Sequence, residues 1–249
     1  MNRMSRAAFA AAAAMLASVA VAAPAQTESA PSQAWQSCEG GDGISLASQI
    51  AGCTAVIQSS GQSATTLAAA FYNRGYAEKR GGQNDRAVED YSQALKLSPG
   101  NPEYYVQRGV SYKNLGKYDQ AFADYEEALR LDPKNSSAFD ARCYAYAILN
   151  QFQKALADCN ASLILEPDAW YTLDSRAFIF LKIGRLNEAV VDYNAALNLN
   201  PQLAESLYGR GIAKIRLGNV AAGNSDIAAA KSINPAVADA MAKMGVSPP

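Results

Sequence analysis

Arginine and aspartate recur together along the chain, and their fixed spacing makes them the first candidates for chemistry. The spacing within each of two series is 34 residues: Arg74, Arg108, Arg142, Arg176 and Arg210, and Asp90, Asp124, Asp158, Asp192 and Asp226. A row of arginines could bind an acidic ligand, but each arginine could instead pair with an aspartate. Because ligand sites seldom recur in every repeat, the pattern favours a ladder of partly buried ion pairs that stabilises the fold.

The four cysteines are the second candidate, because thiols serve as nucleophiles, metal ligands or disulfide partners. Histidine is absent from the sequence and no Cys-x-x-Cys pair occurs, which argues against a zinc site and against any nucleophile–histidine pair. Cys38 and Cys53 enclose a glycine-rich loop and predict a disulfide bridge. Cys143 and Cys159 face each other across one predicted helix pair, where a bridge and two buried free thiols both remain open.

No other group of residues predicts catalysis or a cofactor. The neighbouring carboxylates of Glu126 and Glu127 are expected on solvent-exposed helix faces, and Gly81-Gly82 is not followed by the Lys-Ser/Thr of a phosphate-binding loop. The formal net charge is −1, so no strongly basic surface for nucleic acid or membrane lipid is expected. We therefore predict a non-enzymatic protein with no metal and no cofactor.

Residues 1–25 resemble a secretory signal peptide. Arg3 and Arg6 precede the apolar run 7–23, and Ala23-Pro24-Ala25 is a small-residue cleavage site. The alternative, an uncleaved anchor helix, is disfavoured because the run is short and rich in alanine. We predict cleavage after Ala25, a periplasmic or secreted location, and no membrane span after cleavage. Such an oxidising compartment favours disulfides.

The 34-residue period places the arginine and aspartate series on pairs of short helices. In the unit 102–135, apolar or small residues recur at helical spacing in two runs, which Leu115-Gly116-Lys117 separates. Asn101-Pro102 predicts the start of the first helix, and Asp132-Pro133 the end of the second. Each unit is therefore predicted to be a helix-turn-helix hairpin, and the fold an all-α solenoid of about five such hairpins with capping helices at both ends.

The unit is similar to that of the tetratricopeptide repeat family. That family carries, in order, an aromatic residue, a glycine or alanine, a second aromatic, an alanine, an aromatic, an alanine and a proline. The second unit supplies these positions as Tyr105, Gly109, Tyr112, Ala121, Tyr125, Ala128 and Pro133. Arginine stands where the family usually has leucine, so Asn73-Arg74-Gly75 resembles an Asn-Arg-Gly variant found in exported bacterial repeat proteins.

The period and the resemblance together divide the chain. The expected parts are a signal peptide (1–25), a flexible leader with the first disulfide loop (26–43), an N-terminal capping helix (44–59), repeats at 68–101, 102–135, 136–169 and 170–203, a degenerate fifth repeat (204–237), and a C-terminal cap and tail (238–249). Lys214 and Gly223-Asn224 make the fifth repeat atypical, as is expected at the end of an array.

In this family the first helices line a concave groove that binds peptides, and the resemblance implies the same groove here. The matching positions are mostly aromatic and aliphatic, which suits protein binding: Tyr72, Tyr76, Arg80, Val106, Val110, Lys113, Asp140, Tyr144, Tyr171, Asp174, Phe178, Leu181, Tyr208 and Ile212. The alternative is that other parts of the chain cover these side chains. The lysines and asparagines of a carboxylate clamp are missing.

We therefore expect a non-enzymatic protein-interaction scaffold of the bacterial envelope that binds a peptide or protein segment in this groove. Two alternatives remain: a self-assembling structural module, and an accessory subunit of an envelope enzyme or transport complex.

Overall fold

Residues 32–248 are described by the structure, a computed structural model of the chain; the predicted signal peptide lies outside the described residues. Every regular element within residues 32–248 is an α-helix, and no strand occurs there. The helices are α1 (Gln33–Glu39), α2 (Leu46–Gln58), α3 (Ala64–Arg80), α4 (Asn84–Leu97), α5 (Pro102–Asn114), α6 (Tyr118–Leu131), α7 (Ser136–Ile148), α8 (Phe152–Leu165), α9 (Trp170–Lys182), α10 (Leu186–Leu199), α11 (Ala204–Arg216), α12 (Val220–Ile233) and α13 (Val237–Lys243).

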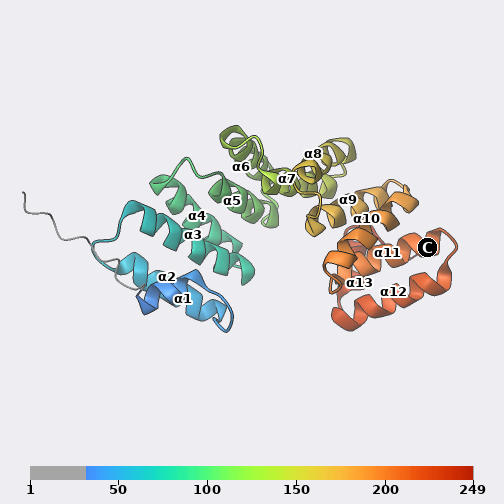
Figure 1. Ribbon diagram of the computed structural model, residues 1–249, viewed down its shortest axis with the longest axis horizontal. Coiled ribbons are helices and arrows are strands. Elements are labelled where there is room, and N and C mark those ends of the chain that lie inside the picture. The colour runs from blue at the N-terminus through green and yellow to red at the C-terminus, as the bar shows by residue number, and fades with distance from the viewer. Residues whose placement is uncertain (1–31, 249) are drawn as a thin grey trace, which may run out of the picture. The chain divides into compact units, whose positions relative to one another are not determined.

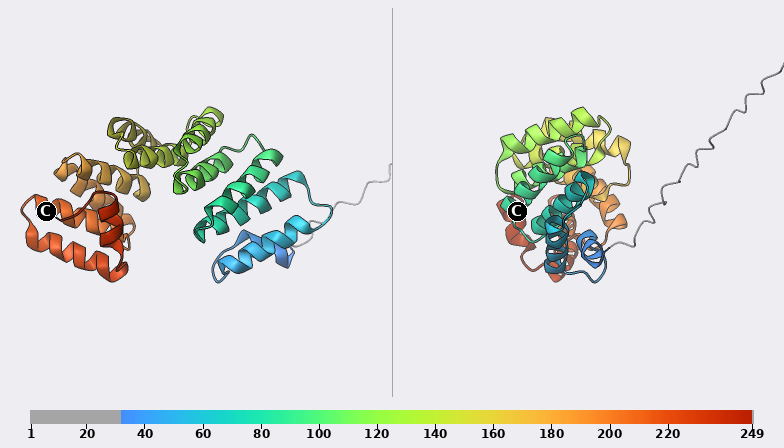
Figure 2. Two further views of the ribbon diagram at one scale, coloured as in Figure 1. Left: turned by 180° about the vertical axis from the view of Figure 1, so that it is seen from behind. Right: turned by 90° about the vertical axis from the view of Figure 1, so that its left-hand side faces the viewer.

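Neighbouring helices pair into hairpins, and the hairpins stack in the order of the chain (Figure 1 and Figure 2). The pairs α3–α4, α5–α6, α7–α8, α9–α10 and α11–α12 are the five predicted repeats. Between hairpins, the first helix of each packs more on the second helix of the preceding hairpin than on its first helix. The all-α solenoid predicted from the period is confirmed.

The turn inside each hairpin needs one residue with positive φ, which side chains other than glycine adopt with difficulty. Gly82, Gly116, Gly184 and Gly218 supply it with φ between 73° and 89°. In the third hairpin Asn150 takes this place with φ 57°. Asparagine tolerates the left-handed region better than most residues, so the hairpin turn keeps its geometry without glycine.

A tyrosine on the second helix fills the interior of most hairpins. Tyr91, Tyr125 and Tyr193 are at most 1% exposed. A Cβ atom added to Gly109 would lie 2.6 Å from Cε1 of Tyr125, so the glycine makes room for the ring. In the third hairpin the same two positions hold Cys143 and Cys159, which form a disulfide. A covalent bond there replaces the contact between glycine and tyrosine.

The predicted ladder of arginine–aspartate pairs is present in every repeat. The guanidinium of Arg108 donates from Nε and Nη2 to the two carboxylate oxygens of Asp124, at 2.9 and 2.7 Å. The other four pairs have the same two-bond geometry. Four arginines also bond the preceding hairpin, as Arg176 Nη1 does to Asn160 Oδ1 at 2.8 Å. The ladder therefore connects the two helices of each unit and also most neighbouring units.

The N-terminal end differs from the prediction of a flexible leader over 26–43, because Gln33–Glu39 forms α1. Ser32 caps this helix by accepting a hydrogen bond from Trp35 N at 3.2 Å. The predicted disulfide between Cys38 and Cys53 is present and ties α1 to α2. The helix at 44–59 is therefore half of a further hairpin rather than a lone cap. Helix α3 also begins before the predicted boundary at residue 68, because Ser63 caps it.

No helix among the described residues has both the length and the apolar character that crossing a membrane requires.

Candidate functional site

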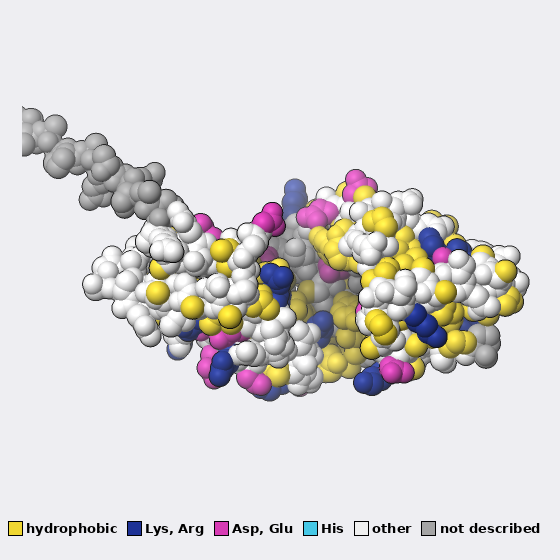
Figure 3. All heavy atoms as spheres, turned by 90° about the horizontal axis from the view of Figure 1, so that it is seen from below, with side chains coloured by type: hydrophobic (Ala, Val, Ile, Leu, Met, Phe, Trp, Pro, Cys, Tyr) yellow, Lys and Arg dark blue, Asp and Glu magenta, His cyan; other side chains and the backbone are white. Residues whose placement is uncertain are grey.

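The first helices of the hairpins form one continuous face. Helices α3, α5, α7, α9 and α11 each contact the next member of this series. Figure 3 shows this part of the molecule hollowed, with hydrophobic and basic side chains on the floor of the hollow. The residues predicted to line a groove lie on these helices, but the structure places them in three different environments.

Stacked tyrosines form the first environment, on α3 and α5. The rings of Tyr72 and Tyr104 stack with centroids 5.0 Å apart, and the ring of Tyr76 stacks on Tyr72 with centroids 6.4 Å apart. The hydroxyl of Tyr72 donates to Glu103 Oε1 at 3.4 Å. Burial is the main reason that the pKa of Tyr72 is raised well above its ordinary value, so this hydroxyl stays protonated and remains a donor.

Tyr76 is the exposed end of this stack, with 38% of its surface accessible. Lys79 Nζ lies 4.7 Å from the centroid of its ring, a cation–π contact. A cavity of about 280 Å³ lies beside it, lined by Tyr72, Tyr76 and Arg80 of α3 and by residues of α1, α2 and their connecting loop. We call Tyr72, Tyr76, Arg80, Val110 and Lys113 the N-terminal inner face. Val106, also predicted to line the groove, is instead buried in a hydrophobic cluster between α5, α6 and α7.

The second environment is a charged cluster between α5 and α7. Lys113 Nζ lies 4.6 Å from the ring centroid of Tyr144. Burial raises the pKa of Asp140 to about 7, an effect that the nearby Lys113 partly offsets. Burial also lowers the pKa of Lys113 to about 8. Asp140 Oδ1 and the hydroxyl of Tyr125 have no hydrogen-bond partner among the described residues, although buried polar groups normally have one.

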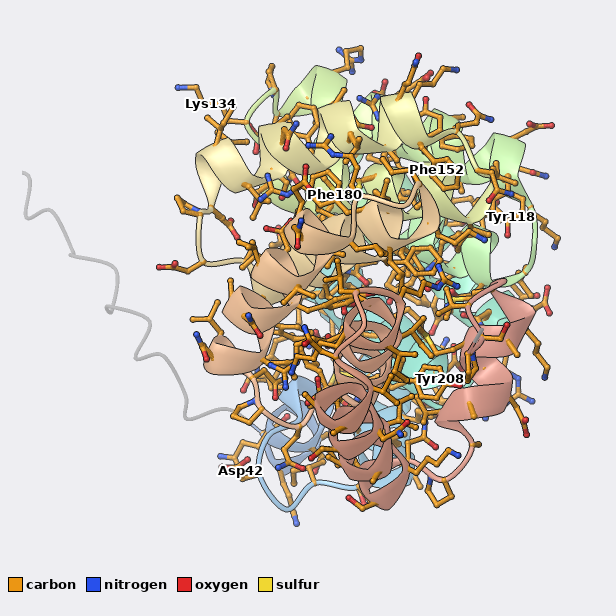
Figure 4. All side chains as sticks on the ribbon, turned by 90° about the vertical axis from the view of Figure 1, so that its right-hand side faces the viewer. Asp42, Tyr118, Lys134, Phe152, Phe180 and Tyr208 are labelled. Atoms are coloured by element: carbon orange, nitrogen blue, oxygen red, sulfur yellow. A yellow bond between two sulfur atoms is a disulfide. The ribbon has the colours of Figure 1, made fainter. Side chains whose placement is uncertain are left out.

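The third environment is apolar and covered. Phe178, Leu181, Tyr208 and Ile212, all predicted to line the groove, are at most 6% exposed. They belong to one hydrophobic cluster with side chains of α13 and the C-terminal tail, and Figure 4 shows Tyr208 among the C-terminal helices. The structure thus brings these residues together as predicted, but the chain's own C-terminus lies over them.

Two further predicted residues lie at the edge of this apolar region and make polar contacts within the chain. Tyr171 donates from its hydroxyl to Glu166 Oε2 at 2.8 Å. Asp174 accepts a hydrogen bond from the hydroxyl of Ser206. Burial raises the pKa of Asp174 to about 6, and the bond from Ser206 acts in the opposite direction.

Sequence reasoning missed three residues that shape the inner face: Glu103, Tyr104 and Lys182. The pair Tyr104-Tyr105 was a signal, because adjacent residues point to different sides of a helix and only one of them can occupy the family's aromatic position. Lys182 had no such signal, since its partner is a carbonyl 62 residues away in the sequence.

The described residues contain no cluster of three or more Cys, Asp or Glu side chains that could hold a metal ion. The inner face carries aromatic surface and a few buried charges.

Comparison with known protein families identifies the repeat unit of this architecture. The profile of the "Tetratricopeptide repeat" matches residues 102–135, and that of the "TPR repeat" matches 75–116 and 179–218. No curated protein sequence matches the chain significantly.

Several solved structures share the fold at low identity. One is the Cut9–Hcn1 hetero-tetramer of APC/C, with TM-score 0.70 and 14% identity over 80% of this chain and 39% of that one. A tetratricopeptide repeat protein from Parabacteroides merdae has a TM-score of 0.59 and 20% identity, over 80% of this chain and 81% of that one. YrrB, described as a TPR protein with an unusual peptide-binding site, has a TM-score of 0.51 and 21% identity, over 78% of this chain and 98% of that one.

The repeat profiles match parts of the first, second, fourth and fifth hairpins, and the similar structures have the same stacked helix pairs. With the 34-residue period and the conserved spacing of its glycine, alanine, tyrosine and proline positions, the chain is a member of the tetratricopeptide repeat family.

Proposed function

We propose that the chain is a non-enzymatic interaction scaffold of the bacterial envelope, and that it binds a peptide or protein segment on the N-terminal inner face. The exposed ring of Tyr76 carries this proposal, because it ends a stack of tyrosines beside a cavity of about 280 Å³. Tyrosine supplies a large contact area with few rotatable bonds and a polar tip, which is why it is enriched at interfaces. The peptide-binding site named for YrrB is in keeping with it.

The envelope location rests on two observations. The N-terminal sequence has the pattern of a signal peptide, and both cysteine pairs form disulfides, which persist in oxidising compartments. The test is titration of free thiols in protein purified without reductant and then unfolded. We expect no free thiol. Four free thiols in protein taken directly from cells would contradict an exported location.

Site-specific photo-crosslinking tests the binding face. A photoreactive phenylalanine analogue replaces Tyr76 on α3 in one variant, and Val191 in a control. Val191 is 64% exposed on α10, a second helix, so it reports random encounters. We expect a discrete crosslinked product in cells from position 76 and none from position 191. Equal products from both positions would contradict the proposal.

Once the partner is purified, its affinity identifies the contact. We expect Tyr72→Ala/Tyr76→Ala to weaken binding at least tenfold, because aromatic anchors dominate interfaces of this kind. We also expect a weak dependence on salt, since an apolar surface supplies most of the contact. A loss of several orders of magnitude in affinity between low and moderate salt would show instead that charged residues carry the binding.

A further inference from the structure

The C-terminal helix departs from the stacking pattern of the other helices. In its contacts with the preceding hairpin, each first helix packs more on the second helix than on the first, but α13 packs more on α11 than on α12. It therefore lies toward the face formed by the first helices instead of extending the stack. Val237 and Met241 of α13 are at most 1% exposed, and they join the hydrophobic cluster that contains Phe178.

After α13 the chain turns at Gly245, with φ 74°, and its last described residues lie against α7, α9 and α11. Val246 is 1% exposed. The hydroxyl of Tyr144, 100 residues earlier, lies 3.8 Å from Sδ of Met244. A cavity of about 300 Å³ remains beside the tail, lined in part by Phe178 of α9 and by Met244.

Two basic side chains hold the main chain of this tail. Lys182 Nζ donates to the carbonyl of Met244 at 2.8 Å, and Arg216 Nη2 donates to the carbonyl of Ser247 at 3.3 Å. Main-chain carbonyls are common to all peptides, so neither contact requires this particular sequence. The side-chain contacts need only one flexible and one branched apolar residue, here Met244 and Val246.

The segment also has features of an element that opens easily. Helix α13 has seven residues and no side-chain hydrogen bond at its N-cap, and short helices depend on packing for their stability. Among the described helices it contacts only α11 and α12, and segments with few packing contacts open locally at a low cost in free energy. Pro235 separates it from α12, so its release does not require α12 to unwind.

We propose that residues 237–248 are an internal ligand of the C-terminal inner face, which we define as Tyr144, Phe178, Lys182, Tyr208, Ile212 and Arg216. A short apolar segment of a partner, with side chains like those of methionine and valine, displaces them and offers its own carbonyls to Lys182 and Arg216. This inference rests on the proposed function in assigning peptide binding to the inner face, but it concerns the half that the chain now covers.

The test uses a fluorescein-labelled peptide of residues 236–249 and follows its binding by fluorescence anisotropy. A chain truncated after Asn234 is expected to bind the peptide at least tenfold more tightly than the full chain, whose own segment competes. If the truncated chain is folded, with a helical spectrum and a cooperative melt, and binds no better than the full chain, the proposal is wrong.

Matched variants identify the contact. In the truncated chain, Lys182→Ala should weaken peptide binding three- to tenfold, whereas Lys134→Ala should leave it unchanged. Lys134 is exposed and lies far from Tyr208 in Figure 4, so it controls for the loss of one positive charge. Equal effects of both substitutions would indicate nonspecific attraction and would overturn the assignment of Lys182.

Should truncation unfold the protein, a full-length variant decides the question. The double variant Met244→Ser/Val246→Ser has the full length but weaker apolar contacts between its tail and the inner face. We expect it to bind the peptide at least threefold more tightly than the unmodified chain. No increase would overturn the proposal. A dimer of the full chain that dissociates on adding the peptide would also overturn it, because the occupant would then be the tail of a second copy.

The crosslinking experiment at Tyr76 is independent of these measurements. If the tail peptide binds as expected but position 76 gives no crosslinked product, the proposed function is contradicted and the internal-ligand proposal stands. If position 76 gives a product but the tail peptide does not bind as expected, the internal-ligand proposal is contradicted and the proposed function stands.

Discussion

The two ends of the inner face have the same arrangement of helices but differ in how much of their side chains is exposed. On α3 and α5 the aromatic side chains stack on one another, and Tyr76 remains 38% exposed. On α9 and α11 the corresponding side chains are buried under α13 and the tail. The repeat determines where a side chain points, whereas the composition of the face and the neighbouring segments determine whether it becomes surface or core.

The largest expected effect comes from replacing one aromatic residue at each end of the inner face. Phe178→Ala removes a ring that is 6% exposed, and we expect the free energy of unfolding to fall by about 3–5 kcal/mol. Tyr76→Ala removes an exposed ring and should change stability by no more than about 0.5 kcal/mol. Urea unfolding followed by circular dichroism measures both. Similar losses at the two positions would mean that the N-terminal inner face is also core.

The disulfide of the third hairpin lies between the two ends. Cys143→Ala/Cys159→Ala opens a loop with a sequence separation of 16, and we expect a loss of about 3 kcal/mol. Because the small residues also leave space where the bridge was, the third hairpin should become the weakest unit, and the thermal transition should broaden. A change below about 1 kcal/mol would show that packing alone holds this hairpin.

The ion-pair ladder recurs in every repeat, so the effect of breaking it should depend on the local partners of each pair and not on the exposure of the inner face. Arg142→Ala leaves the carboxylate of Asp158 unpaired with 9% of its side chain exposed, and we expect a loss of about 2 kcal/mol. Arg210→Ala should cost less, because Lys214 also pairs with Asp226 at 2.8 Å.

The control for the ladder is Arg130→Ala, which removes a surface pair with Glu127. Its effect on the free energy of unfolding should be much smaller than that of Arg142→Ala, because solvent screens an exposed pair. If Arg142→Ala instead abolished partner binding at an unchanged melting temperature, the arginine series would be a ligand site after all.

The smallest effect is a dependence on pH that originates at the charged cluster between the two ends. Burial raises the pKa of Asp140 to about 7, whereas an unfolded aspartate titrates near 4. Between about pH 4 and 7 the folded chain therefore holds a proton that the unfolded chain has released, and this contribution to stability falls as pH rises.

Asp140→Asn removes that proton-linked contribution. We expect the variant to be more stable than the unmodified chain at pH 8, where the buried carboxylate is charged, and to differ little near pH 4.5. Urea unfolding at the two pH values provides the measurement. Parallel pH profiles for the two proteins would show that Asp140 does not titrate in this range.

Much of the fold could be predicted from the sequence because its determinants are local and repeat. Asn101-Pro102 begins α5 as expected, and Arg108 pairs with Asp124 because a sequence separation of 16 places both on one hairpin. The helix at 33–39 was missed, since its stability comes from a cap at Ser32 and a bond between Cys38 and Cys53. Local polarity alone suggested a flexible leader there.

The candidate site could be predicted only in part. Tyr76 and Tyr144 lie two periods of 34 apart, and Tyr208 lies one helical turn before the equivalent position in the fifth repeat, so the sequence predicts that all three share one face. Their exposure to solvent does not follow from the sequence pattern, because Tyr208 is covered by residues that follow it by about one repeat, and Tyr144 contacts Met244, 100 residues later.

The amino-acid sequence by itself determined the repeat, the hairpins, the ion-pair ladder and the family, because each depends on residues that lie within one unit and recur. Only the tertiary structure decided that the C-terminal segment lies on the inner face and that the N-terminal end remains open. The physical reason is that burial depends on contacts between distant segments, and the strength of those contacts is set by the shapes that the folded units present to each other.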